Sequence, residues 1–109
     1  MSNLALVKSA NFGNVTCDIY QNDDGWFMTI NQLAEALEYA DRSGVQKILD
    51  RNAYLNSPEF SGRDKLSYPN GGTQETIVFT EDGIYEITML SKQPKAREFR
   101  AWIRAILKG

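Results

Sequence analysis

The sequence predicts an α+β fold, with an N-terminal antiparallel β-meander, a further hairpin and about four α-helices. Three observations support this prediction. Stretches that alternate apolar and polar residues fill most of the first thirty positions. A second pair of such stretches, Asp64–Tyr68 and Gln74–Phe79, flanks the turn sequence at residues 69–72. Elsewhere, apolar residues recur at three- and four-residue spacings, as in amphipathic helices. At 109 residues and 42% hydrophobic, the chain can bury one core, so we expect a single domain over residues 1–109.

The expected meander has three strands. Gly13-Asn14 supplies the first turn and the Asn-Asp-Asp-Gly sequence of residues 22–25 supplies the second. Trp26–Ile30 forms the third strand. The side chains expected to face inward from the first two strands are Leu4, Leu6, Val15, Cys17 and Ile19.

Two helices are expected between the meander and the hairpin. Asn31 is the expected N-cap of the first, which runs to about Tyr39, and Ser43 with Gln46 predicts a capping box for the second, residues 43–52. Their short connection resembles a helix-turn-helix arrangement. The second helix and its entry carry side chains that can reach phosphates or base edges: Arg42, Gln46, Lys47, Arg51 and Asn52. From the pattern alone, an ordinary solvated helix face is the better interpretation of this set.

The next helix is expected to begin after Thr80. Threonine is a good N-cap, and Glu81 and Asp82 place negative charge at the positive end of the helix dipole. The apolar side chains of this helix spread beyond one stripe, which predicts that it is covered on two sides. They are Ile84, Tyr85, Ile87, Met89 and Leu90.

The last helix carries an apolar face beside a row of cations. Pro94 suits its start, because a proline at the first helical position loses no hydrogen bond. We expect Phe99 and Trp102 to be largely buried and the three arginines exposed. The candidate phosphate contacts are Lys92, Lys95, Arg97, Arg100 and Arg104. Contact with an anionic partner and an ordinary solvated face explain these cations about equally well.

Charge is segregated along the chain. The net charge is −2, but residues 1–40 carry −4, residues 41–91 carry −3 and residues 92–109 carry +5. The basic end therefore has a local field that the total conceals. An acidic total still counts mildly against DNA binding, since strong DNA-binding domains are usually basic.

Several chemistries are disfavoured. The chain has no histidine, which is the commonest general base and metal ligand, and no catalytic or metal-binding set assembles elsewhere. We therefore expect no enzyme activity, cofactor or metal. The single cysteine, Cys17, cannot form an internal disulfide and is expected to be a buried strand thiol. No apolar run reaches the length of a membrane span, so we expect no membrane association and a cytoplasmic location.

Two motifs resemble the Bro-N domain, the N-terminal module of BRO-family proteins and of many phage antirepressors. Trp26–Asp41 resembles the family's W-F-x-x-x-D-[VL]-A-x-x-L-G-Y, with Asn31 in place of the usual Asp and Glu38 in place of the usual Gly. The family's T-E-x-G-[IL]-Y-x-[IL] and S-[KR]-x-P-x-A-x-x-F-[RK]-x-W elements correspond to Thr80, Glu81, Gly83, Ile84, Tyr85, Ile87, Ser91, Lys92, Pro94, Ala96, Phe99, Arg100 and Trp102.

The resemblance implies the DNA-binding module of a phage or prophage antirepressor-like transcriptional regulator in a bacterial host cell. Double-stranded DNA would be the partner, with the basic C-terminal helix on phosphates and helix 43–52 as a groove reader. Because antirepressors engage a repressor, the alternative is a protein-interaction module that binds a phage repressor. A structural domain that forms homo-oligomers is a third interpretation. Bro-N proteins usually continue into a variable C-terminal domain, so we expect this chain to be the N-terminal part of a longer protein.

Overall fold

A five-stranded antiparallel sheet organises the computed structural model, which describes residues 4–67 and 73–108. The strands are β1 (Ala5–Phe12), β2 (Val15–Asn22), β3 (Gly25–Thr29), β4 (Ser61–Ser67) and β5 (Thr73–Thr80). β5 pairs with β3, so the order in the sheet is β1-β2-β3-β5-β4. The predicted meander and later hairpin are confirmed and prove to belong to one sheet. The predicted turn at residues 69–72 lies outside the described residues.

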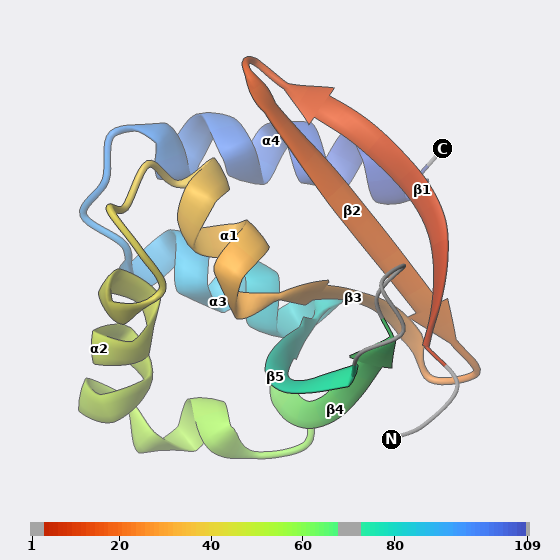
Figure 1. Cartoon of the computed structure of the whole chain (residues 1–109). Helices are drawn as coiled ribbons and strands as arrows, with labels where there is room; N and C mark the ends of the chain where they lie inside the picture. The colour runs from red at the N-terminus through yellow and green to blue at the C-terminus, as the bar shows by residue number, and fades with distance from the viewer. Residues whose placement is uncertain (1–3, 68–72, 109) are drawn as a thin grey trace.

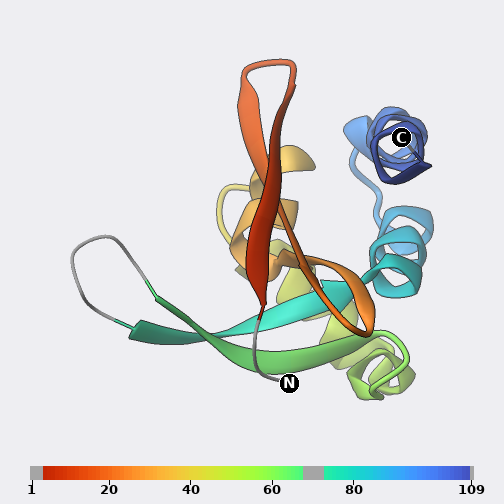
Figure 2. The same ribbon diagram turned by 90° about the vertical axis from the view of Figure 1, so that its right-hand side faces the viewer.

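The two hairpins of this sheet point in different directions. Figure 2 shows the β1–β2 hairpin standing upright while the β4–β5 hairpin runs across beneath it. The cause lies in β2, which pairs with β3 only over Tyr20–Asn22 and then separates from it. At the edge that this separation leaves free, the Asp18 N–H donates to the Gln32 side-chain carbonyl at 3.3 Å. Such a bond satisfies a backbone donor that the ladder no longer uses.

Four α-helices complete the described part of the chain, as predicted. They are α1 (Ile30–Ala36), α2 (Ser43–Arg51), α3 (Glu81–Leu90) and α4 (Lys95–Lys108), with a short 3-10 helix, η1 (Ala53–Asn56), after α2. In Figure 2, α3 and α4 are stacked on one side of the sheet, with α4 beyond the β1–β2 hairpin. The fold is therefore α+β.

The start of α1 corrects the predicted cap. The helix begins at Ile30, and the Thr29 hydroxyl oxygen, not Asn31, accepts a hydrogen bond from the Gln32 N–H at 3.2 Å. Thr29 is the last residue of β3 and has an extended backbone, which is the conformation an N-cap needs. Asn31 instead lies in the first turn with an exposed side chain.

The end of α1 is a Schellman motif, and the helix stops at Ala36 rather than near Tyr39. The Glu38 N–H bonds the Glu35 carbonyl and the Tyr39 N–H bonds the Ala34 carbonyl, both at 3.0 Å. Glu38 has a φ of 67°, in the left-handed region where glycine is usual because it has no Cβ. The departure from the family's glycine therefore leaves the backbone shape intact at a conformational cost.

The predicted capping box at the start of α2 was wrong. The Asp41 carboxylate accepts hydrogen bonds from the Ser43 hydroxyl and, at 2.9 Å, from the Ser43 N–H. These bonds hold the pKa of Asp41 below its usual value. Gln46 does not reach back to the helix start and donates to the Asp50 carboxylate at 3.1 Å. A carboxylate two residues upstream is a stronger acceptor than the Ser43 hydroxyl, and it takes these donors.

The start of α3 agrees with the prediction. The Thr80 hydroxyl accepts from the Gly83 N–H at 3.0 Å and donates to the Glu59 carbonyl at 2.7 Å. Gly83 lies against the chain before β4, where a Cβ would stand 1.9 Å from the Phe60 carbonyl oxygen. Only glycine permits this approach. The Thr-Glu-Asp-Gly element thus has a structural explanation.

The core lies between the sheet and the helices, and α4 contributes Ala96, Ile103 and, as predicted, Phe99 to it. Phe99 is fully buried, with its ring centroid 5.2 Å from that of Phe12. Trp102 is only half-buried, at the margin of this cluster.

Some apolar side chains expected to be covered are exposed. Ile84 and Ile87 of α3 are buried and the helix packs against both the sheet and α4, but Met89 is 59% exposed and Leu90 37% exposed. Leu6 on β1 is 56% exposed, because β1 is an edge strand whose first half lies outside the core cluster. Periodicity shows which residues are apolar, but not how far the neighbouring elements extend.

Candidate nucleic-acid interface

The candidate phosphate contacts on α4 have different surroundings, beginning with Lys95 at the start of the helix. Its ammonium nitrogen lies 5.7 Å from the ring centroid of Phe12, at the end of β1. The same nitrogen lies 3.4 Å from a carboxylate oxygen of Glu98, one helical turn away. Lys95 therefore faces the β1–β2 hairpin and already has an anionic neighbour. The Glu98 carboxylate partly neutralises the Lys95 ammonium, so Lys95 is less available to bind a phosphate.

Arg100 and Arg104 lie on a different flank, against α3. The Arg100 Nε donates to the Thr88 hydroxyl at 3.1 Å, and its side chain is half-buried rather than exposed as predicted. The Arg104 guanidinium carbon lies 5.4 Å from the ring centroid of Tyr85, a cation–π distance. The Tyr85 hydroxyl donates to Glu81 at 2.9 Å, and burial followed by this bond raises the pKa of Tyr85. Both arginines help join α3 to α4.

Lys92 and Arg97 are the two candidates whose charge is uncommitted. Both are exposed, and neither makes a hydrogen bond or ion pair within residues 4–67 and 73–108. Lys92 lies in the α3–α4 connection and Arg97 in the first turn of α4. A helix N-terminus favours anions, so this end of α4 is electrostatically suited to phosphate.

The α3–α4 connection is hydrogen-bonded to the end of α1. The Gln93 side-chain amide donates to the carbonyls of Leu37 at 3.1 Å and Glu38 at 2.9 Å. The Tyr39 and Ser91 hydroxyls lie 2.7 Å apart in a further hydrogen bond. Figure 1 shows the two connections side by side at the left of the molecule, next to α2. Lys92, between Ser91 and Gln93, is therefore held in a connection that is bonded to the end of α1.

The candidate base contacts lie on α2 and at its entry. Arg42, Lys47 and Arg51 are exposed, whereas Gln46 is half-buried and bonded to Asp50. A further side chain considered from the sequence, Asn52, donates to the Ile48 carbonyl at 2.9 Å and closes the helix end. The structure thus leaves three cations of this set free of hydrogen bonds and ion pairs within the described residues.

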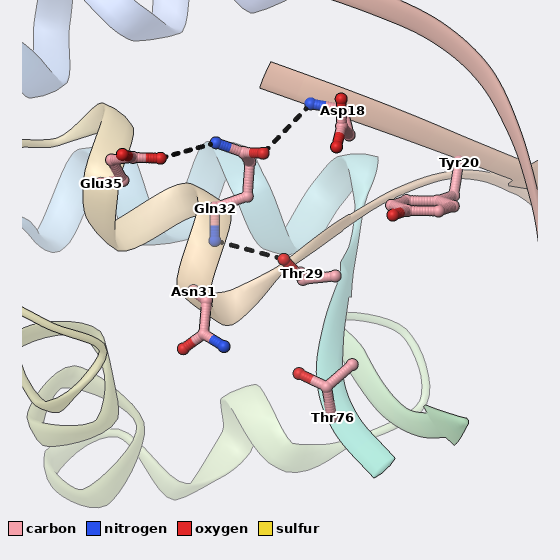
Figure 3. A pocket seen from close by; sticks show the side chains of 7 residues that line it. All are labelled: Asp18, Tyr20, Thr29, Asn31, Gln32, Glu35 and Thr76. Carbon is pink, nitrogen blue, oxygen red and sulfur yellow. Dashed lines mark hydrogen bonds between the residues drawn. The ribbon is translucent and has the colours of Figure 1, made fainter. Parts of the chain in front are cut away.

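Two hollows elsewhere on the surface are acidic. One, of about 210 Å³, opens beside the first turn of α1 and contains the carboxylates of Asp18 and Glu35 (Figure 3). The other, of about 600 Å³, lies at the start of α3 and is lined by four carboxylates, from Asp24, Glu59, Glu81 and Asp82, among other residues. Carboxylates repel phosphates, so neither hollow suits the nucleic-acid backbone.

Cys17 does not offer a nucleophile. Its side chain is fully buried, and burial, followed by the nearby charges of Glu35 and Asp18, raises the pKa of the thiol to about 12. The thiolate is the reactive form, so the thiol is inert at neutral pH. In the part of the chain that the structure describes, no three His, Cys, Asp or Glu side chains gather as metal ligands. No described helix is both long and apolar enough to span a membrane.

The structure defines the class of protein as a small α+β domain in which Lys92 lies in a helix connection that is hydrogen-bonded to the end of α1. The family model described as BRO family, N-terminal domain, matches residues 16–108, and the chain belongs to this Bro-N family. Bro-N domains are DNA-binding regulatory domains rather than a known class of enzyme. No curated protein and no solved structure matches the chain significantly.

Sequence patterns identified every cation discussed above, but they did not identify Gln93, whose side chain joins the α3–α4 connection to the end of α1. Its two acceptors lie 55 and 56 residues upstream, and neither is a side chain. Backbone carbonyls leave no trace in residue types, so no local pattern marks such a bond. The Schellman motif at Glu38 is the nearest signal, because it marks a helix end whose last carbonyls need outside partners.

Proposed function

We propose that this chain is the DNA-binding module of a phage or prophage antirepressor-like transcriptional regulator that acts in the cytoplasm of the bacterial host. The observation that carries the proposal is the hydrogen-bonded junction of Gln93 with the end of α1. Through it, the connection that carries the uncommitted Lys92 is bonded to the end of α1, and Tyr39 of that end contacts Gly44 in the first turn of α2. One duplex can then meet the start of α4 and the exposed face of α2 together.

The two parts of this interface have different roles. Lys92 and Arg97 contact phosphates, and they set orientation and non-specific affinity. Lys95, Arg100 and Arg104 add phosphate contacts at the flanks, where each keeps its partner within the protein. Along α2 and its entry, the side chains that approach base edges in the major groove are Arg42, Gln46, Lys47 and Arg51.

The test is a salt titration of binding to duplex DNA of random sequence, followed by fluorescence anisotropy. Binding should weaken steeply between about 50 and 200 mM salt, because phosphate contacts release counterions. Lys92→Ala and Arg97→Ala should each lower the log–log slope by about one unit and act equally on every sequence.

Lys8→Ala is the matched control. It removes the same charge from an exposed position on β1, an element that the proposed interface does not include, and should leave the slope unchanged. A wild-type domain without salt-dependent binding near 50 mM salt would refute the proposal. If Lys8→Ala and Lys92→Ala changed the salt slope equally, Lys92 would not be part of the DNA-binding surface, and that assignment would be refuted.

A second candidate function, binding of a phage repressor, is favoured by a separate observation. Met89 and Leu90 are exposed at the end of α3, and the exposed ring of Tyr54 is bonded to Glu86 on the same helix face. Exposed apolar groups of this kind suit a protein partner. Capture of the repressor that persists at high salt and is lost in Met89→Ser would support this candidate. Sedimentation across a concentration series tests the homo-oligomer alternative.

A further inference from the structure

We propose that Gln93, together with Tyr39 and Ser91, is a positioning device that fixes α2 relative to α4 and so sets the sequence discrimination of DNA binding. Non-specific affinity would not depend on it. This inference rests on the proposed function and concerns residues that touch no DNA themselves. We name these three residues the junction clamp.

Gln93 closes the end of α1 with one side chain. Both hydrogens of its amide nitrogen are used, one on the Leu37 carbonyl and one on the Glu38 carbonyl. The last carbonyls of a helix have no partner within it and must be satisfied from outside. The left-handed backbone of Glu38 ends the helix here. Gln93 therefore bonds a rigid, defined helix end rather than a loose loop.

Ser91 and Tyr39 extend the bond network to α2. The Ser91 hydroxyl is bonded to the Tyr39 hydroxyl at 2.7 Å and accepts from the Gln93 N–H at 3.2 Å. Ser91 is also the C-cap of α3, with its own N–H on the Ile87 carbonyl at 2.9 Å.

Tyr39 in turn packs against the first turn of α2. A Cβ added to Gly44 would lie 2.2 Å from Cδ1 of the Tyr39 ring, so the ring is in close contact with the α2 backbone. The clamp thus links the end of α1, the start of α2 and the connection that leads into α4. A shift of α2 relative to α4 must disturb at least one of these contacts.

The two kinds of DNA contact respond differently to such a shift. The attraction of a lysine to phosphates changes gradually over the screening length, which is about 8–10 Å at moderate salt. A hydrogen bond to a base edge needs a donor–acceptor distance near 3 Å and a nearly linear angle. Loosening α2 therefore removes discrimination between bases while the charge on the phosphates stays nearly unchanged.

The experiment compares the wild-type domain with Gln93→Met and Tyr39→Phe, the second being the milder change. Gln21→Met, at an exposed position on β2, is the control. Affinities are measured for a duplex that the wild type selects from a random pool and for its scrambled counterpart. Spin labels on Asp50→Cys in α2 and Ala101→Cys in α4 report the distance between the helices, since the buried Cys17 does not label.

Gln93→Met should reduce the ratio of the two affinities by about tenfold or more, the size of one good base contact. Its affinity for the scrambled duplex and its salt slope should remain within about twofold of wild type, because the phosphate contacts are unchanged. In the absence of DNA, the distribution of distances between the two spin labels should be broader in Gln93→Met than in the wild type. Gln21→Met should change neither the affinities, nor the salt slope, nor this distribution.

A merely structural role predicts a lower melting temperature with an unchanged affinity ratio, and that result would overturn the inference. The inference would also be overturned if Tyr39→Phe lowered the affinity for the selected duplex and for the scrambled duplex by the same factor. If the wild type binds DNA but selects no sequence, the inference fails while the proposed function stands. A wild type that binds no duplex would refute the proposed function itself, and the inference with it.

Discussion

Replacing Glu38 by glycine should stabilise the protein, although it removes a side chain just after the end of α1. Glu38 has a φ of 67°, and a side chain in that left-handed conformation costs roughly 1–2 kcal/mol. Glycine adopts it freely but loses about 0.5–1 kcal/mol more conformational entropy on folding. The difference predicts a gain of about 0.5–1 kcal/mol. For a chain of 109 residues this raises the melting temperature by about 2–6 °C.

The matched control is Glu38→Ala, which removes the same carboxylate but keeps a Cβ. The backbone bonds of the Schellman motif and the acceptor for Gln93 are carbonyls and N–H groups, so neither variant removes them. Urea denaturation of the three proteins measures the change in unfolding free energy. If Glu38→Ala stabilises as much as Glu38→Gly, the gain comes from the lost charge and the reasoning is refuted.

Three further predictions concern the core and the caps. Phe99→Ala should cost about 3–5 kcal/mol in urea denaturation, because the ring is fully buried; an unchanged midpoint would contradict the assigned helix face. Thr80→Ala should cost about 1–2 kcal/mol without changing DNA affinity, since its hydroxyl both caps α3 and donates to Glu59. A loss of DNA affinity at unchanged stability would make the cap functional. Because the pKa of Cys17 is raised from 9.0 to about 12, the folded state favours the neutral thiol. That stability is complete below pH 9 and is lost as pH rises toward 12, so the melting temperature should fall less steeply above pH 9 in Cys17→Ala than in the wild type.

Local patterns predicted most elements, and the physical reason is that they depend on neighbours in the chain. Alternation in the first thirty residues gave the meander, and Thr80 with its acidic successors gave the start of α3. The apolar spacing of α4 identified Phe99 as buried. Where a local prediction failed, a competing group lay close by. Thr29 replaced Asn31 because the strand delivered it in the required conformation, and Asp41 took the donors assigned to Ser43.

The arrangement of the candidate interface needed the tertiary structure. Residue types identified all ten candidate cations and polar groups, but spacing alone placed Arg97, Arg100 and Arg104 in one row, with Lys95 at the helix entry. In the structure, Lys95 lies near Phe12 and Glu98. Arg100 is hydrogen-bonded to Thr88, and Arg104 lies over the ring of Tyr85. A side chain that packs against another element loses freedom to bind a partner, and no helical spacing encodes that loss.

By itself, the sequence determined the fold class, the family and the chemical character of the surface, because these follow from composition and short-range order. Only the tertiary structure decided that the meander and the hairpin share a sheet through β3 and β5, and that Gln93 joins the α3–α4 connection to the end of α1. The first decision rests on backbone groups far apart in the chain, and the second on a side-chain donor whose two acceptors are distant backbone carbonyls. Every residue carries the same backbone donor and acceptor, proline aside, so long-range partners are selected by geometry rather than by residue type.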